Sequence, residues 1–95
     1  VYQGTKAAVE YYTKAASKEL LEKNITVNCV APGPMDTPFF YYQEAPEAVE
    51  VYKRWYMQKR LTEIGDIAPI VGFLATGGGW ITGQVIFANG GLAAV

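Results

Sequence analysis

Apolar residues near the start of the chain recur at the spacing of a helix. Between Thr5 and Lys23 they stand three and four residues apart, and charged residues fill many of the positions between them. A basic last turn followed by Asn24, a residue that tolerates the left-handed conformation, indicates where the helix ends. The pattern therefore predicts an amphipathic helix over residues 5–23. Its apolar side is expected to consist of Ala8, Val9, Tyr12, Ala15, Ala16 and Leu20.

The middle of the chain has the pattern of a strand, a loop and a helix. Ile25 to Ala31 is short, rich in β-branched residues and followed by Pro-Gly, which predicts a buried strand. Residues 32–45 are dense in proline and aromatic side chains and are expected to form a loop. Pro46, with Glu47 beside it, favours a helix start, and the apolar spacing extends this helix to about Gln58.

A further helix and a further strand complete the pattern. Asp66 is predicted to cap a helix from Ile67 to Ala75, with Pro69 in the first turn, where proline is tolerated. The glycines at 77–79 end that helix, and Gln84 to Ala88 is predicted as a strand. A strand, helices and a second strand make a crossover unit, so the two strands should be parallel. The expected fold class is therefore α/β.

The composition argues against several kinds of function. The 95 residues have a formal net charge of −1 with basic and acidic side chains interspersed, so neither nucleic acid nor a membrane surface is an expected partner. The chain has no histidine and a single cysteine, Cys29, so we expect no metal site and no internal disulfide. These features favour a cytoplasmic location. No apolar run approaches the roughly 18 residues of a membrane span.

Tyr2 and Lys6 have the clearest chemistry. Their spacing of four puts both side chains on one face of a helix. A free tyrosine has a pKa of about 10 and is a poor base at neutral pH. A lysine cation one turn away and the positive end of the helix dipole would both lower the pKa of Tyr2, so that it could exchange a proton with a carbinol or carbonyl oxygen. Taken alone, the spacing also fits an exposed helical pair, because the chain has seven tyrosines.

Three further stretches of the sequence, taken together with Tyr2 and Lys6, make a recognisable pattern. Residues 26–37 read Thr-Val-Asn-Cys-Val-Ala-Pro-Gly-Pro-Met-Asp-Thr, residues 66–68 read Asp-Ile-Ala, and residues 80–91 read Trp-Ile-Thr-Gly-Gln-Val-Ile-Phe-Ala-Asn-Gly-Gly. Together with the Tyr-x-x-x-Lys motif at 2–6, and in this order, they resemble the C-terminal part of the short-chain dehydrogenase/reductase family. The resemblance covers nearly the whole chain. It implies the C-terminal portion of a Rossmann-type, doubly wound parallel sheet.

The resemblance also implies that part of a domain is missing. Members of the family run to roughly 250 residues in one large domain. Their glycine-rich dinucleotide loop and the strand with the catalytic serine precede the tyrosine. Residues 1–95 are therefore expected to be the substrate-side portion of a single domain whose dinucleotide-binding half is absent. The abrupt entry of Val1-Tyr2 into a helix, with no capping residue ahead of it, fits this expectation.

By this resemblance the parent protein is an oxidoreductase that transfers hydride between NAD or NADP and a small alcohol or ketone. Tyr2 would donate a proton to the carbonyl oxygen, or remove it in the oxidation direction. Lys6 would lower the pKa of the tyrosine and hydrogen-bond the nicotinamide ribose. Both residues would thus be catalytic and would also contact the cofactor. The isolated chain is expected to be inactive.

The turn after the first strand is the second implied site. Open α/β sheets bind ligands at the carboxyl ends of their strands. The resemblance implies that this turn borders the nicotinamide carboxamide, through main-chain groups and the hydroxyl of Thr37. Gly33 would permit a close approach of the backbone. An ordinary strand-to-helix turn is the alternative. The expected cofactor contacts here are Pro32, Gly33, Met35 and Thr37.

Aromatic residues at 39–42 fill the region that forms a substrate lid in relatives. Phe39 and Phe40 are the expected substrate contacts, although a small core under a long loop is an alternative. Asn28 is expected to be a buried amide bonded to neighbouring backbone.

Two other functions stay open: an inactive fragment that self-associates as a structural module, and a non-enzymatic nucleotide-responsive relative. A homo-oligomer, either a dimer or a tetramer, is expected in each case. Relatives pair through the helix after the tyrosine and through the last strand, and a two-stranded parallel sheet exposes both of its edges.

Overall fold

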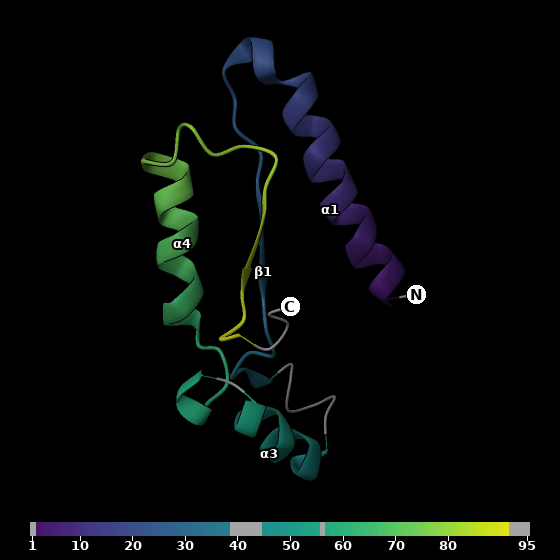
Figure 1. The fold of residues 1–95 in the computed structure, drawn as a ribbon, viewed down its shortest axis with the longest axis vertical. Helices are drawn as coiled ribbons and strands as arrows, with labels where there is room; N and C mark the ends of the chain where they lie inside the picture. The colour runs from purple at the N-terminus through teal and green to yellow at the C-terminus, as the bar shows by residue number, and fades with distance from the viewer. Residues whose placement is uncertain (1, 39–44, 56, 92–95) are drawn as a thin grey trace. The chain divides into compact units, whose positions relative to one another are not determined.

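The computed structural model describes residues 2–38, 45–55 and 57–91 (Figure 1). The chain divides into two compact units, the first formed by residues 1–30 and 70–86 and the second by residues 31–69 and 87–95. In chain order the helices and strands are α1 (Tyr2–Glu19), a 3-10 turn (Leu21–Lys23), β1 (Cys29–Pro32), α3 (Pro46–Trp55), a 3-10 turn (Met57–Lys59), α4 (Ile64–Thr76) and β2 (Val85–Ala88).

β1 and β2 form a two-stranded parallel sheet, which confirms the α/β class and the predicted crossover. Their pairing begins in the first unit, just before the strands themselves. The Gly83 N–H donates to the Val27 carbonyl over 2.8 Å, and the Cys29 N–H donates to the Gln84 carbonyl over 2.9 Å. β1 is shorter and starts later than the predicted strand over 25–31, and its residues are half-buried or exposed rather than buried.

Asn28 reinforces this pairing in the first unit. Its Nδ2 donates to the Ile81 carbonyl over 2.8 Å, and its Oδ1 accepts from the Gln84 N–H over 3.1 Å. The prediction of an amide bonded to neighbouring backbone is therefore confirmed, although Asn28 precedes β1 and is only half-buried. One side chain thus links the chain ahead of β1 to both sides of the turn ahead of β2.

α1 starts and ends earlier than the predicted helix over 5–23. After Glu19 the chain tightens into the 3-10 turn, in which the Lys23 N–H donates to the Leu20 carbonyl. Asn24 then adopts φ 58° and ψ 38°, so the stop predicted from its left-handed tolerance is confirmed.

The buried side of α1 coincides only in part with the predicted apolar side. The residues of that side that are half-buried are Ala8, Ala15, Ala16 and Leu20. Thr13 and Ser17 are 8% and 6% exposed, whereas Val9 and Tyr12 are 46% and 68% exposed. The two hydroxyls can be buried because each is satisfied by its own helix: Thr13 Oγ1 donates to the Val9 carbonyl and Ser17 Oγ to the Lys14 carbonyl. Small residues therefore let α1 pack closely within the first unit, and the apolar pattern alone did not predict this.

The second unit holds corrections to two predicted helices. α3 ends at Trp55 rather than near Gln58, and Gln58 and Lys59 adopt left-handed φ values of 61° and 53°. α4 begins at Ile64, so Asp66 lies inside the first turn and not at the predicted cap position, although its Oδ2 accepts from the N–H of Glu63 just before the helix. Pro69 is the sixth residue of α4 and therefore lies in the second turn, not in the predicted first turn. The most buried apolar side chains of the described residues, Val49 and Leu61, also belong to this unit.

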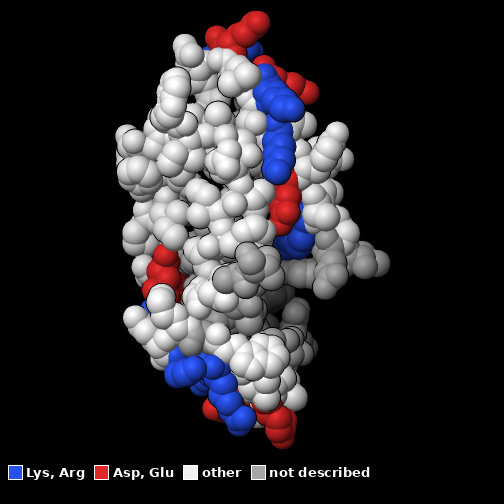
Figure 2. All heavy atoms as spheres, in the orientation of Figure 1, with Lys and Arg blue, Asp and Glu red and all other residues white. Residues whose placement is uncertain are grey.

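The surface carries no large area of a single charge on the face drawn in Figure 2, where basic and acidic side chains are interspersed among uncharged ones. Within the part of the chain that the structure describes, no helix is long and apolar enough to cross a membrane.

Candidate functional site

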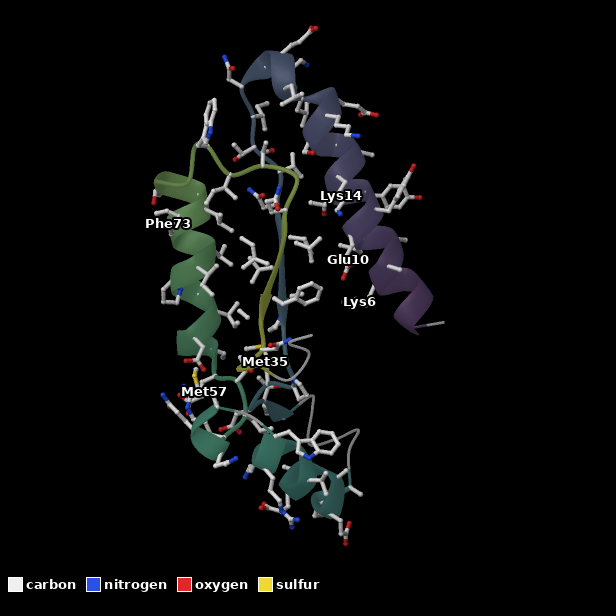
Figure 3. The ribbon with its side chains drawn as sticks, in the orientation of Figure 1. Lys6, Glu10, Lys14, Met35, Met57 and Phe73 are labelled. Carbon is white, nitrogen blue, oxygen red and sulfur yellow. The ribbon has the colours of Figure 1, made fainter. Side chains whose placement is uncertain are left out.

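Tyr2 and Lys6 both lie in the first turns of α1, in the first unit. The helical backbone confirms that the motif at 2–6 has the one-turn spacing on which its chemistry depends. Lys6, Glu10 and Lys14 follow one another along this helix (Figure 3). Lys6 is exposed. The placement of the Tyr2 side chain lies outside the described structure, so the acid–base role of this residue stays a prediction.

The turn predicted to meet the cofactor belongs to the second unit, where Thr62 holds it. Met35 and Thr62 form an isolated parallel bridge. The Thr62 N–H donates to the Pro34 carbonyl over 3.1 Å, and the Asp36 N–H donates to the Thr62 carbonyl over 2.8 Å. The turn after β1 is therefore fixed at the residues on both sides of Met35. Pro32 is the exposed last residue of β1.

This bridge determines which groups of the turn stay open. In a parallel ladder, a residue whose two neighbours bond to the partner directs its own N–H and carbonyl to the opposite side. The Met35 carbonyl accepts from the Thr37 N–H over 2.8 Å, while within the described residues the Met35 N–H donates to no group. An open main-chain N–H with the half-buried Thr37 two residues later makes a donor set that fits an amide such as a carboxamide.

Gly33 makes a close contact inside the second unit, where an added Cβ would force its neighbours to shift. A Cβ added there would lie 3.1 Å from the Cβ of Asn89 and 3.4 Å from Oγ1 of Thr62. The sequence led us to expect that this glycine lets the backbone approach a ligand. The structure shows that the approach is to the turn after β2. That turn is itself held, because Oδ1 of Asn89 accepts from the Gly91 N–H.

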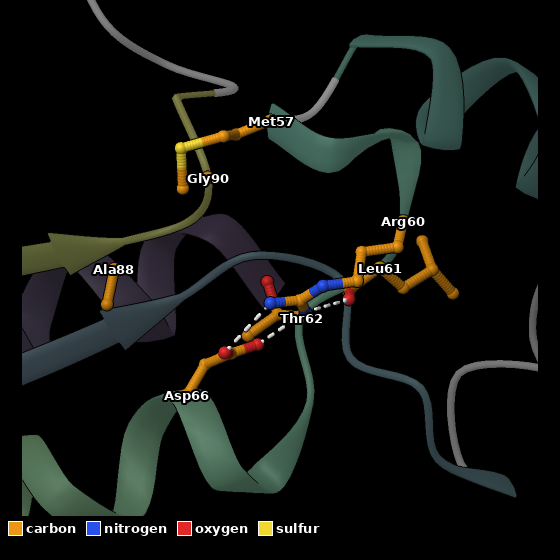
Figure 4. Close-up of a pocket in the computed structure, with 7 residues that line it drawn as sticks. All are labelled: Met57, Arg60, Leu61, Thr62, Asp66, Ala88 and Gly90. Atoms are coloured by element: carbon orange, nitrogen blue, oxygen red, sulfur yellow. Dashed lines mark hydrogen bonds and ion pairs between the residues drawn. The ribbon is translucent and has the colours of Figure 1, made fainter.

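A cavity of about 200 Å³ lies beside the turn after β2 in the second unit (Figure 4). An ion pair forms part of its wall: Arg60 Nη1 is 2.6 Å from Oδ2 of Asp66, and Nη2 is 3.0 Å from Oδ1. The rest of the wall is mostly apolar. The lining residues are Met57, Arg60, Leu61, Thr62, Asp66, Ala88 and Gly90.

The ion pair changes the acid–base properties of both partners. The hydrogen bonds from Arg60, and then the one from the Glu63 N–H, lower the pKa of Asp66 to about 2. The bond to Asp66 likewise raises the pKa of Arg60. Both groups are therefore charged throughout the physiological range.

Sequence reasoning missed Arg60, Thr62 and Asp66 as parts of this site. The sequence singles out Asp66 as a helix cap and as part of the Asp-Ile-Ala stretch, and assigns Arg60 no role. The available signal was an arginine six residues ahead of an acidic residue at a helix start, which is informative only if the intervening chain folds back. Phe39 and Phe40, the predicted substrate contacts, lie outside the described residues.

Comparison with known proteins gives consistent matches over nearly the whole chain. The family model described as Enoyl-(Acyl carrier protein) reductase matches residues 1–93. An NADPH-dependent aldehyde reductase 2, chloroplastic, of Arabidopsis thaliana is 53% identical over 91 residues, which are 95% of this chain and 34% of that protein. A short-chain type dehydrogenase/reductase of Picea abies is 43% identical over 91 residues, again 95% of this chain and 34% of that protein.

Solved structures give the same result. A putative dehydrogenase from Burkholderia cenocepacia with bound NADP superposes with a TM-score of 0.93 at 46% identity, over 99% of this chain and 37% of that one. The chain therefore spans about a third of the length of the proteins it matches.

Proposed function

This chain belongs to the short-chain dehydrogenase/reductase family, and from that premise we propose that it forms the nicotinamide and substrate side of an NADPH-dependent carbonyl reductase. The observation that carries the proposal is the turn after β1, where Thr62 binds the residues on both sides of Met35 and leaves the Met35 N–H without an acceptor among the described residues. This donor lies at the carboxyl end of a parallel strand, where α/β proteins bind their ligands.

NADP is the preferred choice between the two cofactors expected from the sequence. The Arabidopsis relative is named as NADPH-dependent, and the Burkholderia structure contains NADP. When bound, the nicotinamide supplies or accepts the hydride. Main-chain groups at Gly33 and Met35 and the hydroxyl of Thr37 would hold its carboxamide, with Pro32 ordering the entry to the turn.

Tyr2 is the general acid of the proposed reaction. It would donate its phenolic proton to the carbonyl oxygen as that oxygen gains charge, and it would remove the proton from the alcohol in the reverse direction. Lys6, one turn away on α1, would stabilise the phenolate and bind the ribose hydroxyls. Both contacts require a helix that begins no later than Tyr2, and α1 satisfies this condition.

The substrate is proposed to be a small aldehyde or ketone, or the corresponding alcohol. The name of the Arabidopsis relative supports an aldehyde. Phe39 and Phe40 would enclose the substrate and exclude water. We further propose a homo-oligomer, dimeric or tetrameric. A cytoplasmic location is also proposed, with the chloroplast named for the Arabidopsis relative as the alternative.

Substitution of Tyr2 by Phe in the whole protein tests the mechanism. The phenyl ring keeps the packing but cannot donate a proton, so we expect carbonyl reduction to fall by about 100-fold or more while NADPH binding persists. Tyr12→Phe is the matched control, because Tyr12 lies on the same helix and is 68% exposed. Unchanged turnover in the Tyr2→Phe protein would remove the acid–base role.

A further inference from the structure

The Arg60–Asp66 pair does more than close the wall of a cavity. The guanidinium donates to four acceptors: Gln58 Oε1, the Leu61 carbonyl and both carboxylate oxygens of Asp66. An arginine has five N–H donors, so these contacts leave at most one for any other group. This distribution argues against Arg60 as an anchor for an anionic ligand. It is the pattern expected of a side chain that holds its own backbone in place.

The groups that the pair holds lie on both sides of Thr62. Arg60 Nη1 donates to the carbonyl of Leu61 over 3.0 Å, and Oδ2 of Asp66 accepts from the N–H of Glu63 over 2.8 Å. Leu61 and Thr62 are 2% and 6% exposed, so the peptide between these contacts is packed as well as hydrogen-bonded. The ion pair therefore fixes the orientation of the Thr62 peptide groups.

Thr62 passes this constraint to the turn after β1. Its N–H and carbonyl bond to Pro34 and Asp36, and these two bonds are what turn the Met35 N–H outward. The connection from the ion pair to the open donor thus runs through consecutive hydrogen bonds, all inside the second unit.

The backbone just before Arg60 is strained in the conformation that lets Arg60 reach Asp66. Gln58 and Lys59 have φ values of 61° and 53°, a region that disfavours residues other than glycine. Local contacts support the strained turn: Lys59 Nζ donates to the Arg54 carbonyl over 2.9 Å, and the Met57 N–H donates to the Gly90 carbonyl over 2.9 Å. The turn brings Arg60 back to a carboxylate six residues further along the chain.

We infer that Arg60, held by Asp66, is a positioning residue that sets the affinity for the nicotinamide by fixing the turn at Pro34–Asp36 through Thr62. The inference rests on the proposed function for its ligand, and on the described contacts for its mechanism. Arg60 contacts neither substrate nor cofactor in this scheme. Its loss should therefore weaken the binding of NADPH without slowing the chemical step.

The test uses Arg60→Met in the whole protein, with Arg54→Met as the matched control. Arg54 is an exposed arginine on α3 of the same unit, and the substitution leaves its carbonyl in place to bind Lys59. The first readout needs no cofactor: amide hydrogen exchange at Thr62 and Asp36, the two N–H groups that join the segments. Arg60→Met should speed this exchange about tenfold, and the control should not change it.

The second readout is NADPH binding together with steady-state kinetics. Arg60→Met should raise the dissociation constant and the KM for NADPH by about tenfold with kcat unchanged, because a turn no longer held through Arg60–Asp66 would bind the nicotinamide less well in the ground state and the transition state alike. Arg60→Lys keeps the charge but lacks the planar fork, so it should fall between the wild type and Arg60→Met. It also preserves the test if the Met variant does not fold.

The possible outcomes distinguish a failure of this inference from a failure of the proposed function. Unchanged amide exchange in Arg60→Met and Arg60→Lys would overturn the inference, as would faster exchange with unchanged NADPH affinity. A lowered kcat with unchanged KM would also overturn it, because that would place Arg60 in the chemical step. Faster exchange in a protein whose wild type binds no NADPH would uphold the coupling of Arg60 to the turn, and would instead overturn the proposed function.

Discussion

Gly33 lies against Asn89 so closely that no other residue fits at position 33 without movement. A Cβ there would lie 3.1 Å from the Asn89 Cβ and 3.3 Å from its Cα, and the second of these atoms belongs to the backbone. The two residues are far apart in the sequence, one after β1 and one after β2. Their contact brings the candidate cofactor turn and the last turn of the described chain together within the second unit.

Gly33→Ala is therefore expected to destabilise the fold and weaken cofactor binding. Overpacking at a site whose neighbours include backbone costs about 1–3 kcal/mol. Chemical denaturation measures the loss of stability, and NADPH titration measures the loss of affinity. Gly72→Ala is the control: within the described structure nothing but its own helix lies near an added Cβ, and alanine in the interior of α4 should stabilise the protein by about 0.5–1 kcal/mol. An equally stable Gly33→Ala protein would contradict the packing described here.

Gly83→Ala tests the close packing of α1 in the first unit. Gly83 has φ +73°, and an added Cβ would lie 2.8 Å from Oγ of Ser17. Backbone strain alone should cost about 1–3 kcal/mol, and the clash adds to it. The double variant with Ser17→Ala removes the oxygen and should recover only part of the lost stability, because the left-handed φ remains. Thermal melts of the four proteins give the coupling, and full additivity would show that the two residues do not meet.

Asn28→Ala removes the amide that ties the chain ahead of β1 to the turn ahead of β2. The Ile81 carbonyl and the Gln84 N–H both lose their partner, and because Gln84 is exposed and can bond to water, the loss of stability should be about 0.5–1.5 kcal/mol. Asn24→Gly is the control on the same segment, since its φ of 58° suits glycine and should change stability by less than about 0.5 kcal/mol. Denaturant midpoints distinguish the two, and similar midpoints would rule out a structural role for Asn28.

The stabilisation that the Arg60–Asp66 pair gives to the folded protein is expected to be lost at acid pH. The folded pKa of Asp66, about 2, is below its ordinary value of 3.8, so the carboxylate stabilises the folded state above that ordinary value. The contribution is lost as the pH falls from about 3.8 to about 2. Melts of the wild type and of Asp66→Asn should therefore differ by a constant amount from pH 7 to about pH 5, and the difference should shrink below that and be lost only once the pH is below about 2. A difference that disappears above pH 5 would show that the pair does not form.

Local sequence signals predicted the features that depend on neighbouring residues. Asn24 marked the end of the first helical segment because its left-handed tolerance is a property of the residue itself. The glycines after Thr76 likewise marked the end of α4, where the N–H groups of Gly77 and Gly78 both donate to the Phe73 carbonyl. The strand–helix–strand order led to a parallel sheet because crossover connections allow few alternatives.

Signals of the same kind failed where a distant contact decided the outcome. Asp66 has the properties of a cap, but in the structure it lies within the first turn of α4 and its carboxylate binds Arg60. The apolar side predicted for α1 is exposed at Tyr12, while Ser17 is buried. The carboxylate of Asp66 is bound by a residue six positions earlier, and Ser17 is packed against Gly83, and periodicity identifies neither neighbour.

The sequence by itself determined the order of the elements, the family and the helical spacing of Tyr2 and Lys6, because each depends on residue types at short separations. Only the tertiary structure decided that Gly33 faces Asn89 and that Thr62 holds the turn around Met35. These contacts form between segments that folding alone brings together, at distances where one added carbon or one lost hydrogen bond changes the result.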